Sequence, residues 1–113
     1  MKLTKKNFLK ECGNPELANK VLNQMGADWK ELIKYPEDYR DAGNGVSGFI
    51  YYSETEPFAK RNIELILKVL AEFEEDCGTL NKPKENILNW YSWFALENTI
   101  QDVIYFKENT EAY

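Results

Sequence analysis

The stretch from Pro83 to Lys107 places the strongest limit on what this chain can fold into. Its 25 residues hold two of the three tryptophans, two phenylalanines and two tyrosines, and no glycine or proline follows Pro83. Because glycine and proline most often interrupt helices, their absence predicts one long helix over about 83–106. Apolar residues lie on nearly every side of this helix, so either other helices enclose it or one side is a binding face. The polar residues 108–113 are expected to fray.

A second long helix is predicted over about 57–77, between Pro57 and Gly78. Only a short polar connection separates the two long helices, which favours an antiparallel pair. Acidic side chains crowd the end of this helix, where the helix dipole prefers cations. They form either a solvated helix end or an anionic contact patch. The acidic residues of this candidate patch are Glu64, Glu72, Glu74, Glu75 and Asp76.

Short helices are predicted ahead of the two long ones. Thr4 has the side chain to cap a helix over 5–12, and Gly13 is expected to end that helix in the left-handed conformation. Pro15 fits the first position of a second helix, and Gly26 ends that helix. The spacing of apolar residues between Pro15 and Gly26 is that of an amphipathic helix.

Two further short helices are predicted to begin after Asp28 and at Pro36. The glycine-rich segment 43–48 matches the pattern GxGxxG, but it follows no strand and is interpreted as a structural loop. Residues 49–52 have no second strand to pair with and are interpreted as a short buried helix. The chain is therefore expected to form a single all-α domain over 1–113.

The complete absence of histidine excludes several kinds of chemistry. It removes the usual general base at neutral pH, the commonest zinc ligand and every nucleophile arrangement that depends on histidine. No other catalytic signature is recognisable in the sequence. We therefore expect a protein that is not an enzyme, with no catalytic residues, no metal and no cofactor.

The net charge of −5 is unevenly distributed along the chain. Residues 1–34 carry a net charge of +3, and residues 35–113 carry −8. An acidic chain without a basic stripe is not typical of a nucleic-acid binder, so a basic protein surface is the favoured partner. No apolar window is long enough for a membrane span, and no export signal is recognisable. Cys12 and Cys77 are therefore expected to be reduced thiols of a cytoplasmic protein in a bacterial host.

Four residues form a candidate pocket for a nucleotide-like ligand: Tyr51, Tyr52, Arg61 and Glu97. Glu97 lies inside the most apolar run of the chain and has three interpretations, as a member of an ion pair, as a functional acid or base, or as simply exposed. Burial without a cation would raise its pKa. Trp90 is a candidate contact residue for a partner or for a homodimer, because it cannot easily share one core with the nearby Trp93.

Two segments of the chain carry a pattern that also occurs in a known family. The pattern is formed by Ser47–Tyr52, Thr55, Phe58, Asn62 and Trp93–Glu97. It resembles a family of small uncharacterised proteins encoded by phages, prophages and related mobile elements. The resemblance begins near Gly26. It implies that the gene belongs with those of phages and mobile elements, and it implies no activity. Small acidic phage proteins are often inhibitors of host machinery, including restriction and CRISPR nucleases.

These observations favour a non-catalytic binding protein, a phage-type inhibitor of a host defence nuclease that acts through an acidic helical face. Such nucleases present basic nucleic-acid channels, which an acidic face can occupy. The alternative is a binder or sponge for a small nucleotide-like molecule. A small hydrolase that uses Glu97 is the third hypothesis.

Overall fold

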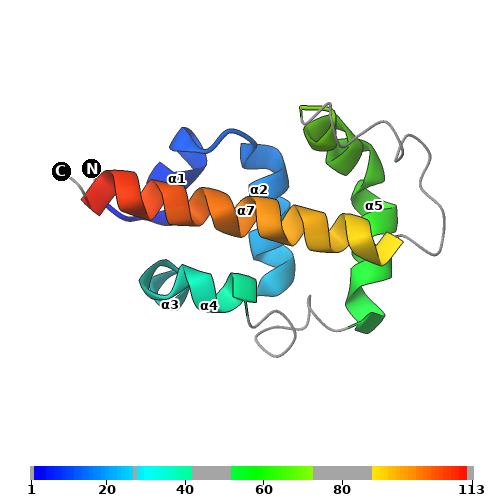
Figure 1. The fold of residues 1–113 in the computed structure, drawn as a ribbon, viewed down its shortest axis with the longest axis horizontal. Helices are drawn as coiled ribbons and strands as arrows, with labels where there is room; N and C mark the ends of the chain where they lie inside the picture. Colours follow the sequence, from blue (N-terminus) through cyan, green and yellow to red (C-terminus); the bar gives the residue numbers. More distant parts are fainter. Residues whose placement is uncertain (1, 27, 42–51, 73–87, 112–113) are drawn as a thin grey trace.

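A long helix near the C-terminus, α7 (Leu88–Glu111), lies across the other helices of the protein (Figure 1). The computed structural model describes residues 2–26, 28–41, 52–72 and 88–111. Within these ranges every regular element is a helix, which confirms the all-α prediction. The other helices are α1 (Lys5–Glu11), α2 (Pro15–Met25), α3 (Trp29–Lys34), α4 (Pro36–Asp41) and α5 (Tyr52–Leu70).

The first helix, α1, begins as predicted but ends differently. The hydroxyl of Thr4 accepts a hydrogen bond from the backbone N–H of Asn7 at 3.1 Å, so Thr4 is a side-chain N-cap. At the other end, Cys12 is extended, with φ −73° and ψ 152°, and its N–H donates to the carbonyl of Phe8. The left-handed conformation predicted for Gly13 is wrong, because the extended Cys12 already turns the chain away from α1.

The boundaries of α2, α3 and α4 follow the sequence. Pro15 occupies the first turn of α2, and Gly26 ends that helix in the left-handed conformation, with φ 64°. α3 starts directly after Asp28, although the Asp28 side chain makes no capping hydrogen bond. Pro36 opens α4, because proline fits the first position of a helix but cannot continue the preceding one.

The fifth helix, α5, is displaced along the chain relative to the prediction. It starts at Tyr52 instead of Pro57 and ends at Leu70 instead of near residue 77. A proline inside a helix removes one backbone hydrogen bond, which is why the prediction placed Pro57 at the first position. Here the surrounding packing outweighs that loss, since Phe58 and Ala59 directly after the proline are buried.

A kink divides α5 at Asn62. The backbone there leaves helical geometry, with φ −122° and ψ 18°. The side-chain amide of Asn62 donates a hydrogen bond to the carbonyl of Phe58 at 3.0 Å. A side chain that inserts into the hydrogen-bond ladder of its own helix is a known cause of kinks.

The two long helices cross instead of forming the antiparallel pair that the short connection favoured (Figure 1). α7 passes over both α2 and α5 and contacts every other described helix. It also continues to Glu111, beyond the end predicted near residue 106. None of the described helices is long and apolar enough to cross a membrane.

Several predictions concern positions outside the described residues. They are the glycine-rich loop over 43–48, the helix over 49–51, the first residues of the last helix over 83–87, and Cys77.

The core lies between α7 and the helices beneath it. Every described helix contributes buried side chains to one cluster. One side of α7 is buried along its length. Its buried residues are Leu96, Ile100, Val103 and Ile104.

An aromatic cluster fixes α1 against α3 and α7. The ring of Phe8, which has no exposed surface, lies 5.5 Å from the ring of Trp29 and 5.7 Å from that of Phe106. Trp29 also donates its indole N–H to the carbonyl of Leu3 at 3.0 Å. Such aromatic pairs add about 0.5–1.5 kcal/mol each beyond the burial of their area. The N-terminal segment is therefore part of the core.

Candidate functional site

The acidic patch predicted on α5 is only partly described by the structure. Glu64 and Glu72 are exposed, as a contact patch requires. Arg61 and Lys68 are exposed on the same helix, so the described part of this surface carries both signs of charge. The predicted site side chains that lie outside the described ones are Tyr51, Tyr52, Glu74, Glu75, Asp76 and Trp90.

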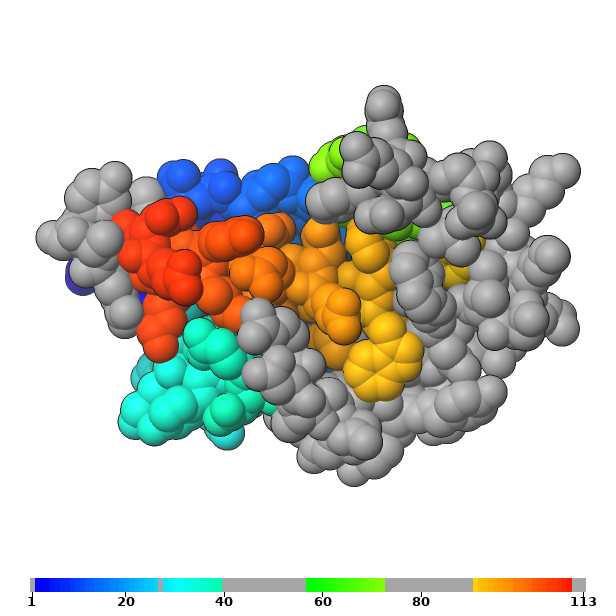
Figure 2. Space-filling model, viewed as in Figure 1, coloured from blue at the N-terminus to red at the C-terminus, as the bar shows by residue number. Residues whose placement is uncertain are grey.

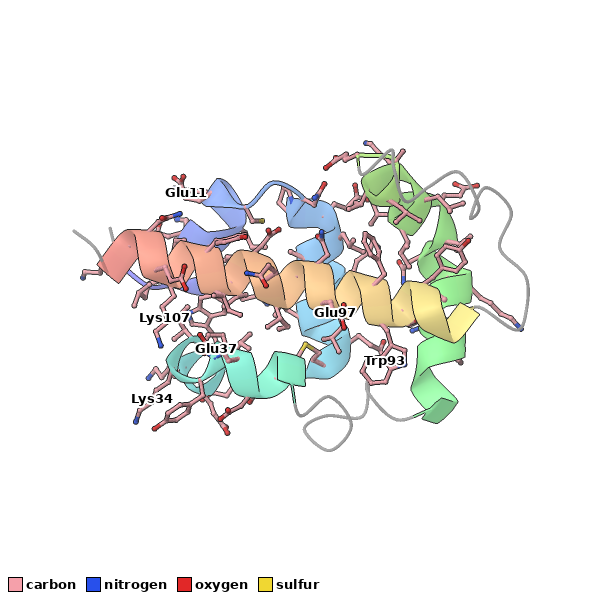
Figure 3. The ribbon with its side chains drawn as sticks, viewed as in Figure 1. Glu11, Lys34, Glu37, Trp93, Glu97 and Lys107 are labelled. Atoms are coloured by element: carbon pink, nitrogen blue, oxygen red, sulfur yellow. The ribbon has the colours of Figure 1, made fainter. Side chains whose placement is uncertain are left out.

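The two described members of the predicted nucleotide pocket lie in different places. The guanidinium of Arg61 donates to the side-chain oxygen of Gln24 at 3.0 Å, which ties α5 to α2. Glu97 lies on α7 and is exposed, which corresponds to the third interpretation of this residue (Figure 3). Arg61 lines an open hollow of about 600 Å³ between α2 and α5, and Glu97 does not line it. The lining residues of that hollow are Lys20, Asn23, Gln24, Phe58, Arg61 and Asn62.

A different hollow lies where the turn between α1 and α2 meets the C-terminal half of α7, and we call it the corner pocket. Its volume is about 550 Å³, within the range of about 300–1,000 Å³ that is typical of ligand pockets. In the space-filling view, α7 forms a band on this face of the molecule, between α1 and α2 on one side and α3 and α4 on the other (Figure 2). The corner pocket is lined by Glu11, Cys12, Gly13, Asp102, Tyr105, Phe106, Asn109 and Thr110.

Two local features of the chain form the corner pocket. Asp102, Tyr105, Phe106 and Asn109 follow the spacing i, i+3, i+4, i+7, which places them on one face of α7. The extended Cys12 turns the chain from α1 toward α2 beside this face. Phe106 is only 7% exposed and belongs to the aromatic cluster, so it closes the base of the pocket, whereas Tyr105 is 56% exposed and stands at the rim.

The carboxyl group of Asp102 is one of two perturbed groups among the described residues of the corner pocket. Partial burial raises the pKa of Asp102 above the ordinary range of aspartate, and the negative charge of Glu72 raises it further. Glu72 belongs to the turn that follows α5. The charge of a third segment of the chain, besides α7 and the turn after α1, therefore affects the pKa of Asp102. Within the described part of the chain, no cation or hydrogen-bond donor is paired with Asp102.

The thiol of Cys12 shares this environment. Burial raises the pKa of Cys12 and the charge of Asp102 raises it further, while backbone N–H groups act in the opposite direction. Cys12 is a free thiol, as predicted. A thiol with a raised pKa stays protonated at neutral pH, so it is both a poor nucleophile and a poor metal ligand. No group of three His, Cys, Asp or Glu side chains among the described residues is arranged to hold a metal ion.

Two cations lie close in the sequence to Asp102 and Glu72, and both make contacts outside the corner pocket. Lys107 donates its ammonium to the carbonyl of Lys34 at 2.9 Å, on the α3 side of α7. Figure 3 shows Lys107 and Glu11 on opposite sides of α7. Lys68 lines a neighbouring hollow together with Glu72, but it does not line the corner pocket. The pocket itself is therefore acidic.

The sequence reasoning predicted little of this site. Glu72 was expected to belong to a patch on α5 alone, and Asp102 was not predicted as a site residue. The available signal was a carboxylate at 102 followed, on the same helical face, by aromatic residues at 105 and 106. That signal does not indicate which other residues belong to the site, because Glu11 and Glu72 come from distant parts of the chain.

One family model matches residues 14–110 and is described as a domain of unknown function, DUF7222. No curated protein and no solved structure is significantly similar to the chain. The match begins at the N-cap of α2. It therefore contains Glu72 and Asp102 but leaves out α1, Glu11 and Cys12.

Proposed function

The chain belongs to the DUF7222 family, whose description names no activity, and we propose from its own residues that it is a non-catalytic binding protein for a basic protein surface. The contact surface would be the corner pocket with Glu72 beside it. This surface differs from the patch on α5 alone, because it joins the end of α5 to α7 and to the turn after α1.

The state of Asp102 is the observation that carries this proposal. Burial and the charge of Glu72 raise the pKa of this partly buried carboxyl group, and no cation among the described residues is paired with it. Its ionised form is therefore unfavourable in the isolated protein. A cation supplied from outside favours the ionised form and relieves it. The exposed ring of Tyr105 stands at the rim of the same pocket. Tyrosine is among the residues enriched at protein interfaces.

In its specific form, the partner is a bacterial defence nuclease of the restriction or CRISPR type, and this protein is its phage-encoded inhibitor. The resemblance to small phage proteins supports this form, as does the net charge of −5. A nuclease binds nucleic acid through a basic surface, and an acidic protein can occupy that surface by charge complementarity.

The proposal is tested by capturing partners from bacterial lysates with the tagged protein. The matched baits are the wild type, the double variant Glu72→Gln with Asp102→Asn, and the control Glu97→Gln, which removes an exposed carboxylate of α7 outside the corner pocket. We expect one specific protein to bind the wild type and the control, and to bind the double variant at least tenfold more weakly. Equal capture by all three baits, or no specific capture, contradicts the proposal.

The inhibitor form needs a second measurement. The captured protein is purified, and its nucleic-acid cleavage is titrated with the wild type and with the double variant. Inhibition by the wild type alone supports the specific form. A partner without nuclease activity removes the inhibitor form and leaves the binding function in place.

A further inference from the structure

The corner pocket has a shape and a set of side chains that specify the cation it receives. We propose that it is a receptor for one arginine side chain of the partner, with the Asp102 carboxylate binding the guanidinium between the rings of Tyr105 and Phe106. The inference rests on the proposed function, because a protein partner must supply the arginine.

The charge of the lining establishes that the ligand group is a cation. Glu11 and Asp102 both line the corner pocket, and the described residues of the lining include no lysine or arginine. Glu72 adds a third negative charge close enough to act on Asp102. An anionic ligand would meet repulsion from all three carboxylates, whereas a cation is attracted by each of them.

The aromatic lining favours a planar cation over a compact one. Tyr105 and Phe106 both line this pocket, Tyr105 as an exposed residue and Phe106 as a buried one. A guanidinium stacks on aromatic faces and is weakly hydrated, so it gives up less hydration on entering than the ammonium of lysine. It also pairs with a carboxylate through two parallel hydrogen bonds.

The polar groups of the lining offer hydrogen-bond acceptors for the donors that an arginine brings. A guanidinium carries five N–H donors and no acceptor. Asp102 and Glu11 offer carboxylate oxygens, and Asn109 and Thr110 offer a side-chain carbonyl and a hydroxyl. The protonated thiol of Cys12 and the ring of Phe106 supply apolar surface for the methylene groups of the arginine. The pocket, at about 550 Å³, is large enough to take the whole side chain.

The other cations fit this lining less well. A divalent metal ion needs several converging ligands, and no such group exists among the described residues. A lysine ammonium is a strongly hydrated point charge that gains little from two aromatic rings. Free small amines also carry a positive charge but lack the planar group. They are not the proposed ligand, and their binding is measured in the experiment below.

The test is a titration followed by two-dimensional ¹H–¹⁵N NMR of the full chain. The probe is N-acetyl-arginine-methylamide, and the matched control probe is N-acetyl-citrulline-methylamide, which has nearly the same shape but no charge. The lysine derivative and putrescine are the further probes. We expect the arginine probe to shift the amide signals of the residues that line the corner pocket, with a dissociation constant in the millimolar range. We expect each of the other probes to bind at least fivefold more weakly.

Two variants connect the binding to the named residues. Asp102→Asn should abolish the shifts, and Tyr105→Ala should weaken binding severalfold, because Tyr105 is exposed and its removal leaves the core intact. Glu97→Gln is the control and should bind as the wild type does. The amide spectrum of each variant also shows that it is folded. Equal binding of arginine and citrulline, tighter binding of putrescine, or unchanged binding by Asp102→Asn overturns the inference.

The inference and the proposed function fail in distinguishable ways. If a specific partner is captured through this surface but the arginine probe shifts no corner residue, the inference is wrong and the function stands. If the arginine probe binds as expected but no partner is captured, the pocket chemistry stands and the proposed function is wrong.

Discussion

At Asp102, burial and the charge of Glu72 act in the same direction, because both disfavour the ionised carboxylate. The folded-state pKa is therefore higher than that of the unfolded chain, which is about 3.9. The contribution of Asp102 to stability is fully present below this unfolded pKa. It is lost as the pH rises through the raised pKa of the folded state, so at neutral pH the ionised Asp102 reduces the stability of the protein.

We expect Asp102→Asn to raise the melting temperature at pH 7, by a few degrees at most. At pH 3 the carboxyl is protonated in both states, so the same variant should melt close to the wild type. Among the described residues, Glu72 is the charged group that acts on Asp102, and Asp102 in turn acts on Cys12. The measurement is thermal unfolding followed by circular dichroism, with Glu97→Gln as the control. An equal shift at both pH values would count against the assigned cause.

The residues of the corner pocket show why the candidate site was beyond reach of the sequence. A carboxylate within the apolar stretch around 102 is visible in the sequence, but burial and neighbouring charges set its chemistry. Those neighbours, Glu11 and Glu72, are brought close by the crossing of three helices and not by any spacing along the chain. Glu97 shows the same limit, since the sequence left its burial or exposure open and only the structure shows that it is exposed.

Among the elements, α5 combines a kink with a contact across to α2. The amide of Asn62 donates a hydrogen bond to the carbonyl of Phe58 within α5, and both residues line the hollow between α2 and α5. Arg61, next to the kink, bonds Gln24. The kink therefore sits where α5 is held against its neighbour.

We expect Asn62→Asp to lower the free energy of unfolding by about 1–2 kcal/mol, because it replaces the donated hydrogen bond with a carboxylate facing a carbonyl oxygen. Asn23→Asp is the matched control. The side-chain oxygen of Asn23 accepts from the ammonium of Lys5 at 3.4 Å, so aspartate keeps that acceptor, and a change within about 0.5 kcal/mol is expected. Urea unfolding measures both. Similar losses for the two variants would show that the amide of Asn62 does not support the kink.

The helix boundaries show which sequence signals were reliable. Proline at the first helical position and glycine just after the last predicted the limits of α2 and the start of α4, because proline has a fixed φ that suits a helix start and glycine readily adopts the left-handed conformation that ends a helix. The same signals failed at Gly13 and at Pro57. There the extended Cys12 and the packing of Phe58 decided the local structure instead.

The arrangement of α7 was predictable only in part. Its apolar composition left two alternatives open, that other helices enclose it or that one side is a binding face. Apolar residues on several sides give no single stripe, however, so periodicity could not say which helix meets which side. The short connection then favoured an antiparallel pair, whereas the structure has crossing helices.

At the scale of the whole molecule, the residues that pack into one core extend beyond the residues that the family model matches. The match begins at residue 14, but Phe8 of α1 is fully buried against Trp29 and Phe106. Residues ahead of the match also line the corner pocket. α1 is therefore required both for the core and for the candidate site.

We expect deletion of residues 1–13 to lower the free energy of unfolding by at least about 3 kcal/mol, since losing one buried phenylalanine side chain alone costs about 3–5 kcal/mol. Phe8→Ala in the full chain should account for most of this loss. Tyr105→Ala, at an exposed aromatic position, should change stability much less. Urea unfolding of the purified chains compares them. An unchanged midpoint for the shortened chain would mean that α1 is an appendage.

The position of α7 along the chain has a consequence for biosynthesis. α7 contacts each of the other described helices, yet it is translated after all of them. A ribosome adds about 5–20 residues per second, so the earlier helices wait for seconds without the element that covers them. During that interval their apolar sides remain open to chaperones and proteases. Collapse to the native core can therefore occur only once translation has passed α7, which makes the nascent chain sensitive to any stall late in synthesis.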